Sequence, residues 1–426
     1  GDDYAAYISE GIAIAEGHFD EQTMLNSLMH PSPLSDKTIS GPLVYVWGYP
    51  LLLALVYKFV GFDRVAFTSI LYYKLPSIVC FALLAGTLYF FLRRRFPRSI
   101  SLVLSTIFAG YEGFYEFMDL LCSDIVFLFF FMLTLLLIEL FLSERKPRKR
   151  LLLGIAFGSA MWYTYEVRLN GIAVLFAAVL AQSIEYIYNR RLPKARDLPT
   201  ELSPYITFAL LVFISSLILP SPTRDSGIDA SLFIGNLIYY FNLILNWFGL
   251  LVMNPVYIIV SFLIDPIPYN LLIDITPFIR YTLLVLCLIG ILFSDKRQNL
   301  YLILLFVVYY ISVCLLPYRQ GLRYIYPLLP ILLMFIGQGF AALVRAIHFA
   351  FPHFKCTKYA VGILCAVLSL IAFIPIVKTD IGVMRGQPKV SVTAEISGDD
   401  LYSDVAVETY NYISENTPPD CKIGFI

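Results

Sequence analysis

The chain has 426 residues, of which 59% are hydrophobic and 15% are charged, and its formal net charge is zero. A soluble core does not need so much apolar sequence, so the composition excludes an ordinary soluble globular protein and indicates a polytopic membrane protein. The balanced charge argues against a nucleic-acid partner. Seven cysteines without a Cys-x-x-Cys spacing predict neither a disulfide framework nor a metal site.

Residues 1–65 are comparatively polar and begin with the acidic pair Asp2-Asp3. Apolar and aromatic residues follow at roughly helical spacing from Tyr7 onward, and the pattern stops at Gly17. The spacing predicts an amphipathic helix with the acidic pair near its N-terminus. Two interpretations stay open for the pair: a helix cap that complements the helix dipole, or carboxylates that carry out chemistry at the membrane surface.

Residues 41–55 are first aromatic and then apolar. The segment is short for a complete span once Pro50 is counted, so an interfacial re-entrant or surface helix is predicted. Trp47 and Tyr49 would then line a groove for a lipid substrate, or they would simply belong to an aromatic belt at the interface.

The bundle is predicted to occupy residues 66–377, with about 10–12 transmembrane helices. Segments long enough to cross about 30 Å of hydrocarbon lie near 66–92, 122–142, 170–188, 203–219, 277–293, 300–316, 324–347 and 358–377. Two shorter candidates lie near 100–112 and 151–166. The region 231–264 is compatible with one span, two spans or interfacial helices.

Basic clusters set the expected orientation, because Lys and Arg concentrate in cytoplasmic loops. The clusters follow alternate spans, at 93–98, 145–150, 190–196, 296–297 and 355–358. The outer loops are therefore expected at 1–65, 113–121, 167–169, 220–276, 317–323 and 378–426. This arrangement predicts a multi-pass protein of the inner or plasma membrane with its unusual charges gathered on the extracytoplasmic face.

Acidic residues mark the outer end of the span near 122–142. The pair Ser123-Asp124 could cap a helix, but an ionisable group such as Asp124 that enters a bilayer is costly and often faces an internal cavity. Glu116 and Asp119 precede it, either as ordinary interface charges or as part of an acceptor groove.

Three arginines, Arg168, Arg319 and Arg323, are expected on the outer face. This is unusual, because positive residues concentrate in cytoplasmic loops. Arg168 could form an ion pair with Glu166 or with another outer carboxylate, and the other two could reach to the interface. Three arginines near two or more carboxylates instead predict a charged cavity that binds a phosphate through bidentate contacts.

Together these residues describe a base and phosphate-binding cations in a site open to lipid. A sugar linked to a lipid phosphate would suit this site, because the phosphate is a good leaving group. Such an enzyme needs a general base for the acceptor and cations for the departing phosphate.

On these residues the sequence resembles the GT-C superfamily of integral-membrane glycosyltransferases, in the branch with protein O-mannosyltransferases and the aminoarabinose transferases of lipid A. In that branch an acidic pair opens the first periplasmic loop, ahead of a helix that ends in Gly, and Asp2-Asp3, Tyr7 and Gly17 match this pattern. The resemblance implies that Asp2 is the catalytic base, with Asp3 as the alternative. A second carboxylate at the mouth of a later span matches Asp124.

The run from Arg323-Tyr324 to Pro327 matches an Arg-Tyr…Pro pattern of that branch, which implies binding of the lipid phosphate. The branch also has a span ahead of the acidic pair, so the sequence is expected to be truncated at its N-terminal end. The last residues, 422–426, read like a strand cut short, so truncation is expected at the C-terminal end too. The segment 378–426 reads as the start of a small extracytoplasmic α/β domain.

Residues 38–42 depart from the resemblance, because Thr-Ile-Ser-Gly-Pro lacks the charges of the Glu-Lys-Pro-Pro segment in the aminoarabinose branch. Lipid A modification is therefore not implied. No cofactor or metal ligand is predicted, and a divalent metal ion stays an open option.

The expected function is an inverting transfer of a sugar from a polyprenyl-phosphate donor to a lipid, glycan or protein acceptor. A transporter or flippase of lipid-linked saccharides is the main alternative, and it predicts internal repeats and helices broken at mid-membrane. A non-catalytic assembly protein is the third reading, in which Asp2, Asp3 and Asp124 are only caps. Neither the sugar nor the acceptor can be named from the sequence.

Overall fold

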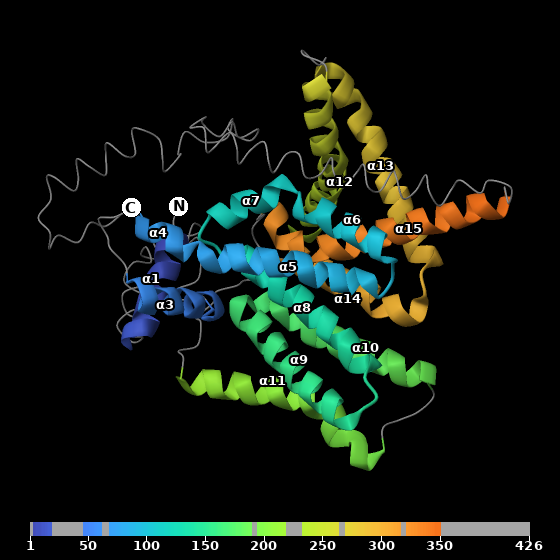
Figure 1. Ribbon diagram of the computed structural model, residues 1–426. Coiled ribbons are helices and arrows are strands. Elements are labelled where there is room, and N and C mark those ends of the chain that lie inside the picture. Colours follow the sequence, from blue (N-terminus) through green and yellow to red (C-terminus); the bar gives the residue numbers. More distant parts are fainter. Residues whose placement is uncertain are drawn as a thin grey trace, which may run out of the picture. The chain divides into compact units, whose positions relative to one another are not determined.

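The computed structural model describes residues 3–18, 46–61, 68–189, 194–218, 232–263, 269–316 and 321–350. All regular secondary structure in these ranges is helical (Figure 1), which confirms the all-α prediction. Several expectations lie outside the described residues, among them the span at 358–377, the α/β segment at 378–426, and the side chains of Asp2, Asp3 and Arg319.

Two helices come from the first predicted loop. Helix α1 (Asp3–Glu16) starts at the acidic pair and ends at Gly17, whose φ is 82°. The amide groups of Gly17 and His18 both donate to the carbonyl of Ala13 at 2.9 Å, so a left-handed glycine closes the helix, as predicted. Helix α3 (Gly48–Val60) packs against α1. Their placement in the membrane interface stays a prediction.

Seven helices in the described ranges are long and apolar enough to cross a membrane. They are Leu71–Arg93, Asp124–Ser143, Leu169–Asn189, Leu198–Ile218, Phe233–Leu251, Lys296–Cys314 and Leu322–Ala346. These spans include α5 (Leu75–Arg93), α8 (Asp124–Ser143), α10 (Ile172–Asn189), α11 (Leu198–Ile218), α14 (Lys296–Cys314) and α15 (Leu329–Ala350). The chain is therefore a multi-pass integral membrane protein.

Shorter apolar helices supplement these spans: α3, α6 (Arg98–Ala109) and the stretch Pro277–Phe293 of α13 (Tyr269–Phe293). The ambiguous region 231–264 forms one continuous helix, α12 (Phe233–Leu263), which pairs with α13 as a hairpin (Figure 1).

Helix α8 lies in the core of the bundle, between α5 and α9 (Pro147–Val167). Its apolar residues surround the whole helix, and Ile125, Leu128 and Phe131 are all fully buried. A helix that is apolar on every side belongs in such an interior position. In a membrane, close packing of such side chains, rather than their removal from water, holds helices together. This packing holds the first residue of α8, Asp124, at a defined place.

Ion pairs tie the ends of several helices on the side assigned to the cytoplasm. Glu139 of α8 pairs with Arg94, at 2.8 Å, and with Arg95 of the α5–α6 turn. The hydroxyl of Tyr301 on α14 donates to the same carboxylate at 2.7 Å. Arg150 of α9 pairs with Glu201 of α11 at 2.8 Å. These arginines, predicted as topological signals, therefore also join helices to one another.

Candidate functional site

The candidate site is built around an ion pair at the start of α8. Nη2 of Arg168 lies 2.7 Å from Oδ2 of Asp124, whose side chain is almost completely buried. Nε of Arg168 donates to Oγ of Ser123 at 3.0 Å. Neither oxygen of Asp124 has an aligned hydrogen-bond donor among the described residues, so the contact is an ion pair rather than a fork of hydrogen bonds.

The short turn between α9 and α10 brings Arg168 to this position. Arg168 ends α9 with an extended backbone, and the 3-10 turn η1 (Leu169–Gly171) then leads directly into α10. Of the two pairings that the sequence left open, the structure shows Arg168 with Asp124. Glu166 instead accepts hydrogen bonds from Ser215 at 2.8 Å and from Trp162 at 3.2 Å.

The charge of Arg168 is stabilised by its partner. Burial by itself lowers the pKa of a guanidinium, but the attraction of the Asp124 carboxylate outweighs it and raises the pKa of Arg168. The guanidinium therefore stays charged throughout the physiological pH range.

Ser123 connects this ion pair to helix α1. The Tyr7 hydroxyl and Ser123 Oγ share a buried hydrogen bond of 3.2 Å. The sequence suggested Ser123 as a helix cap, but its side chain makes no capping hydrogen bond. Its proximity to Asp124 in the sequence was a signal for this role, but the partner, more than one hundred residues away, was not predictable.

Asp3, the second residue of the acidic pair, begins the helix that reaches this contact. Tyr7 follows Asp3 four residues later on the same face. Four residues of helix rise about 6 Å. The backbone of Asp3 therefore lies about one turn from the residue that contacts Ser123, whereas the side chains of Asp2 and Asp3 are outside the description.

A second arginine reaches the site through the 3-10 helix η4 (Leu322–Leu328). The guanidinium of Arg168 lies 5.3 Å from the centre of the Tyr324 ring, and that of Arg323 lies 5.6 Å from the same ring. Both distances are in the range of cation–π contacts. Before η4, Gly321 takes a φ of 71°, a backbone conformation that favours glycine. The structure thus brings Arg323 and Tyr324 beside Arg168.

The predicted groove residues are mainly packing groups in this structure. Trp47 and Tyr49 are 1% and 0% exposed, and the Tyr7 and Tyr49 rings meet edge to face at 5.0 Å. Their part in a groove stays a prediction. Glu116 and Asp119 belong to α7 (Glu112–Asp119), and their side chains are outside the description.

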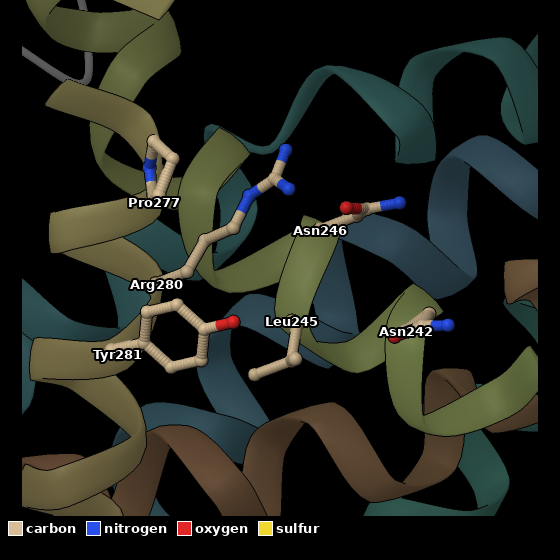
Figure 2. A pocket seen from close by; sticks show the side chains of 6 residues that line it. All are labelled: Asn242, Leu245, Asn246, Pro277, Arg280 and Tyr281. Atoms are coloured by element: carbon tan, nitrogen blue, oxygen red, sulfur yellow. The ribbon is translucent and has the colours of Figure 1, made fainter. Parts of the chain in front are cut away.

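A cavity of about 450 Å³ lies between α12 and α13, lined by Asn242, Leu245, Asn246, Pro277, Arg280 and Tyr281 (Figure 2). The prediction from sequence did not include Arg280. The missed signal was a single arginine in the apolar segment 277–293, since ionisable residues in such segments are often functional.

No group of three or more His, Cys, Asp or Glu side chains that could hold a metal ion occurs in the described part of the chain.

The fold and the buried carboxylate–arginine pair define an all-α, multi-pass membrane protein with a charged site at one end of its helices. Residues 42–218 match the family described as dolichyl-phosphate-mannose-protein mannosyltransferase, which is of the GT-C type. The match confirms the resemblance over α3 to α11, less than half of the chain, and contains Asp124 and Arg168. No curated protein and no solved structure matches the chain. The match supports a membrane glycosyltransferase of the GT-C type.

Proposed function

We propose that this chain is a glycosyltransferase that moves a sugar from a polyprenyl-phosphate donor to an acceptor on the extracytoplasmic face. The hydrogen bond between Tyr7 and Ser123 carries the proposal, because it joins the helix of the acidic pair to the start of α8, where Asp124 lies. A cap on an isolated helix needs no such connection. The family match over residues 42–218 supports the same class of reaction.

In the proposed reaction, Asp2 or Asp3 accepts the proton of the acceptor hydroxyl as its oxygen attacks the anomeric carbon. The bond between that carbon and the phosphate oxygen breaks, and the lipid phosphate departs with the electron pair. Attack opposite the leaving group inverts the configuration at the anomeric carbon. No water is consumed, and the proton ends on the aspartate.

Arg168 is proposed to stabilise the charge on the departing phosphate. A guanidinium has five N–H donors. Asp124 contacts Nη2 and Ser123 accepts from Nε, so the Nη1 group remains for a phosphate oxygen. The side chain of Arg168 is 17% exposed, compared with 1% for that of Asp124. We therefore propose that Asp124 orients Arg168 and that Arg168 contacts the substrate. Arg323, with Arg319, would supply further positive charge.

The base assignment is tested with Asp2→Asn, Asp3→Asn and the double variant. Membranes that contain each variant are incubated with labelled polyprenyl-phosphate sugars, and the label transferred to acceptors is measured. Asp2→Asn is expected to abolish transfer while the protein still inserts in the membrane, because the amide cannot accept the proton.

Glu185→Gln is the matched control, because Glu185 is a carboxylate on α10 that pairs with Arg297 on the opposite side of the bundle. This variant is expected to transfer sugar at the normal rate. Full transfer by all three aspartate variants would contradict the proposed function.

A further inference from the structure

The cavity between α12 and α13 contains an arginine without a counterion. Nε of Arg280 is buried and has no hydrogen-bond partner, and no described carboxylate pairs with this side chain. It differs in this respect from four other arginines of the described ranges, since Arg95, Arg150, Arg168 and Arg297 each pair with a carboxylate. Arg280 is half-buried, and a buried polar atom such as its Nε is costly without a partner, so the residue has the chemistry of a site that an anion completes.

The polar groups around Arg280 can recognise the oxygens of such an anion. Figure 2 shows the guanidinium extending from α13 toward Asn246 on α12, with Asn242 one helical turn away on the same helix. Each asparagine amide supplies two N–H donors, and the guanidinium fits tetrahedral oxyanions through paired contacts. Polar side chains from two helices therefore line one cavity.

The surface around the cavity indicates a lipid as the source of the anion. The flanking side chains on the two helices are apolar and strongly exposed, as shown by Ile238 at 55%, Phe278 at 74% and Val285 at 53%. In a protein with several membrane spans, such a face is expected to contact acyl chains. A molecule that enters between these side chains needs both a hydrophobic body and a charged head.

The position of Arg280 along α13 fits a lipid headgroup. Arg280 precedes Phe293 by thirteen residues, a rise of about 20 Å along the helix. Lys296 and Arg297 follow α13, and basic residues of this kind are assigned to the cytoplasmic side. Arg280 therefore falls toward the opposite, extracytoplasmic side, where headgroups of the outer leaflet lie.

We propose that this cavity binds the phosphate group of a membrane lipid, with Arg280 as the cation and Asn242 and Asn246 as hydrogen-bonding partners. The same chemistry is present in a polyprenyl phosphate and in an anionic phospholipid. If the lipid is the polyprenyl-phosphate donor, the inference rests on the proposed function. The inference that the cavity binds a lipid phosphate does not itself depend on the proposed function.

The test is a titration of the purified full chain, in a non-ionic detergent, with three lipids followed by native mass spectrometry. The lipids are polyprenyl monophosphate, phosphatidylglycerol, and polyprenol, which has the chain but no phosphate. Arg280→Gln is expected to weaken binding of a phosphate-bearing lipid by about tenfold or more, the effect of losing a charge-assisted hydrogen bond. Binding of polyprenol is expected to be unchanged.

Two further variants separate recognition from general damage to the fold. Asn246→Ala keeps the charge of Arg280 and is expected to weaken binding of the phosphate-bearing lipids by a smaller factor. Arg297→Gln removes one positive charge from a guanidinium already paired with Glu185, and it is expected to leave all three affinities unchanged. A loss restricted to polyprenyl monophosphate identifies a donor site, whereas a loss for both phosphate lipids identifies a general headgroup site.

Equal affinity of Arg280→Gln and the unaltered chain for both phosphate lipids would overturn this inference, as would an equal loss for polyprenol. The two proposals also fail separately. A chain that transfers no sugar but loses phosphate-lipid binding in Arg280→Gln contradicts only the proposed function. Sugar transfer that depends on Asp2, together with lipid binding that is insensitive to Arg280, contradicts only the proposal that the cavity binds a lipid phosphate.

Discussion

Asp124 and Arg168 show how the environment of one residue sets the role of another. Asp124 was predicted as a helix cap or as a charge that faces a cavity, and Arg168 as the partner of Glu166 or of another outer carboxylate, or as a phosphate-binding residue. Their separation of 2.7 Å makes them one unit, in which the more buried carboxylate keeps the arginine charged and oriented. The removal of either partner therefore changes both stability and the chemistry available to the site.

This coupling predicts different outcomes for stability and for activity. Asp124→Asn leaves the buried Arg168 without a counterion and is expected to lower the free energy of unfolding by about 3–5 kcal/mol. The double variant Asp124→Asn/Arg168→Gln removes both charges and is expected to regain much of that stability while sugar transfer stays lost. Thermal unfolding in detergent and transfer in membranes measure the two effects. Recovery of transfer in the double variant would exclude a direct role for Arg168.

At the scale of helices, glycine determines how closely α13 and α15 approach. A Cβ atom at Gly290 would lie 1.8 Å from the carbonyl oxygen of Phe335, and one at Gly339 would lie 1.9 Å from that of Leu286. The two backbones therefore meet reciprocally, each glycine against the carbonyl of the other helix. Small residues allow such contact in membranes, where packing rather than exclusion of water holds helices together.

Gly290→Ala is expected to force these helices apart and to lower the free energy of unfolding by about 1–3 kcal/mol. Gly86→Ala is the matched control, because Gly86 is in α5 with open space around its Cβ position. Alanine is the better helix former by about 1 kcal/mol, so this control is expected to be neutral or stabilising. Thermal unfolding of both variants in detergent gives the comparison. Equal stability of Gly290→Ala and the unaltered chain would show that the helix crossing tolerates a methyl group.

The first-loop helices and most spans were predictable because hydrophobic periodicity and apolar length are local properties. Gly17 at the end of α1 and Asp124 at the start of α8 were both anticipated from neighbouring residues. The ambiguity at 231–264 was not resolved by the sequence, because apolar length alone does not distinguish one long helix from two. Arg280 was missed for a related reason, since its cavity requires two helices to be paired.

At the scale of the whole molecule, the alternation of basic loops assigns a side of the membrane to each helix end. The ends that carry Arg168, Arg323 and α1 meet in one site, while Glu139 and Glu201 join helices through basic residues of the opposite ends. The described contacts therefore divide into two sets, one at each end of the helices, and which set faces the cytoplasm stays a prediction.

The orientation itself is testable with single cysteines in a background where the native cysteines are replaced by serine or alanine. His18→Cys, after α1, is expected to react with a membrane-impermeant maleimide in intact cells. Arg145→Cys, in the exposed turn between α8 and α9, is expected to react only after permeabilisation. Labelling is read on the purified protein. Reaction of both positions in intact cells, or of Arg145→Cys alone, would contradict the assigned topology.

The sequence by itself determined the membrane class and the helical character, and it supplied the residue types of the proposed lipid-phosphate site, because composition, periodicity and charge bias act along the chain. Only the tertiary structure decided that Arg168 pairs with Asp124 rather than Glu166, and that Tyr7 reaches Ser123. It also decided that Arg280 lines a cavity without a carboxylate partner in the described ranges. These features depend on distances between helices far apart in the sequence, and those distances are set by packing in the bundle.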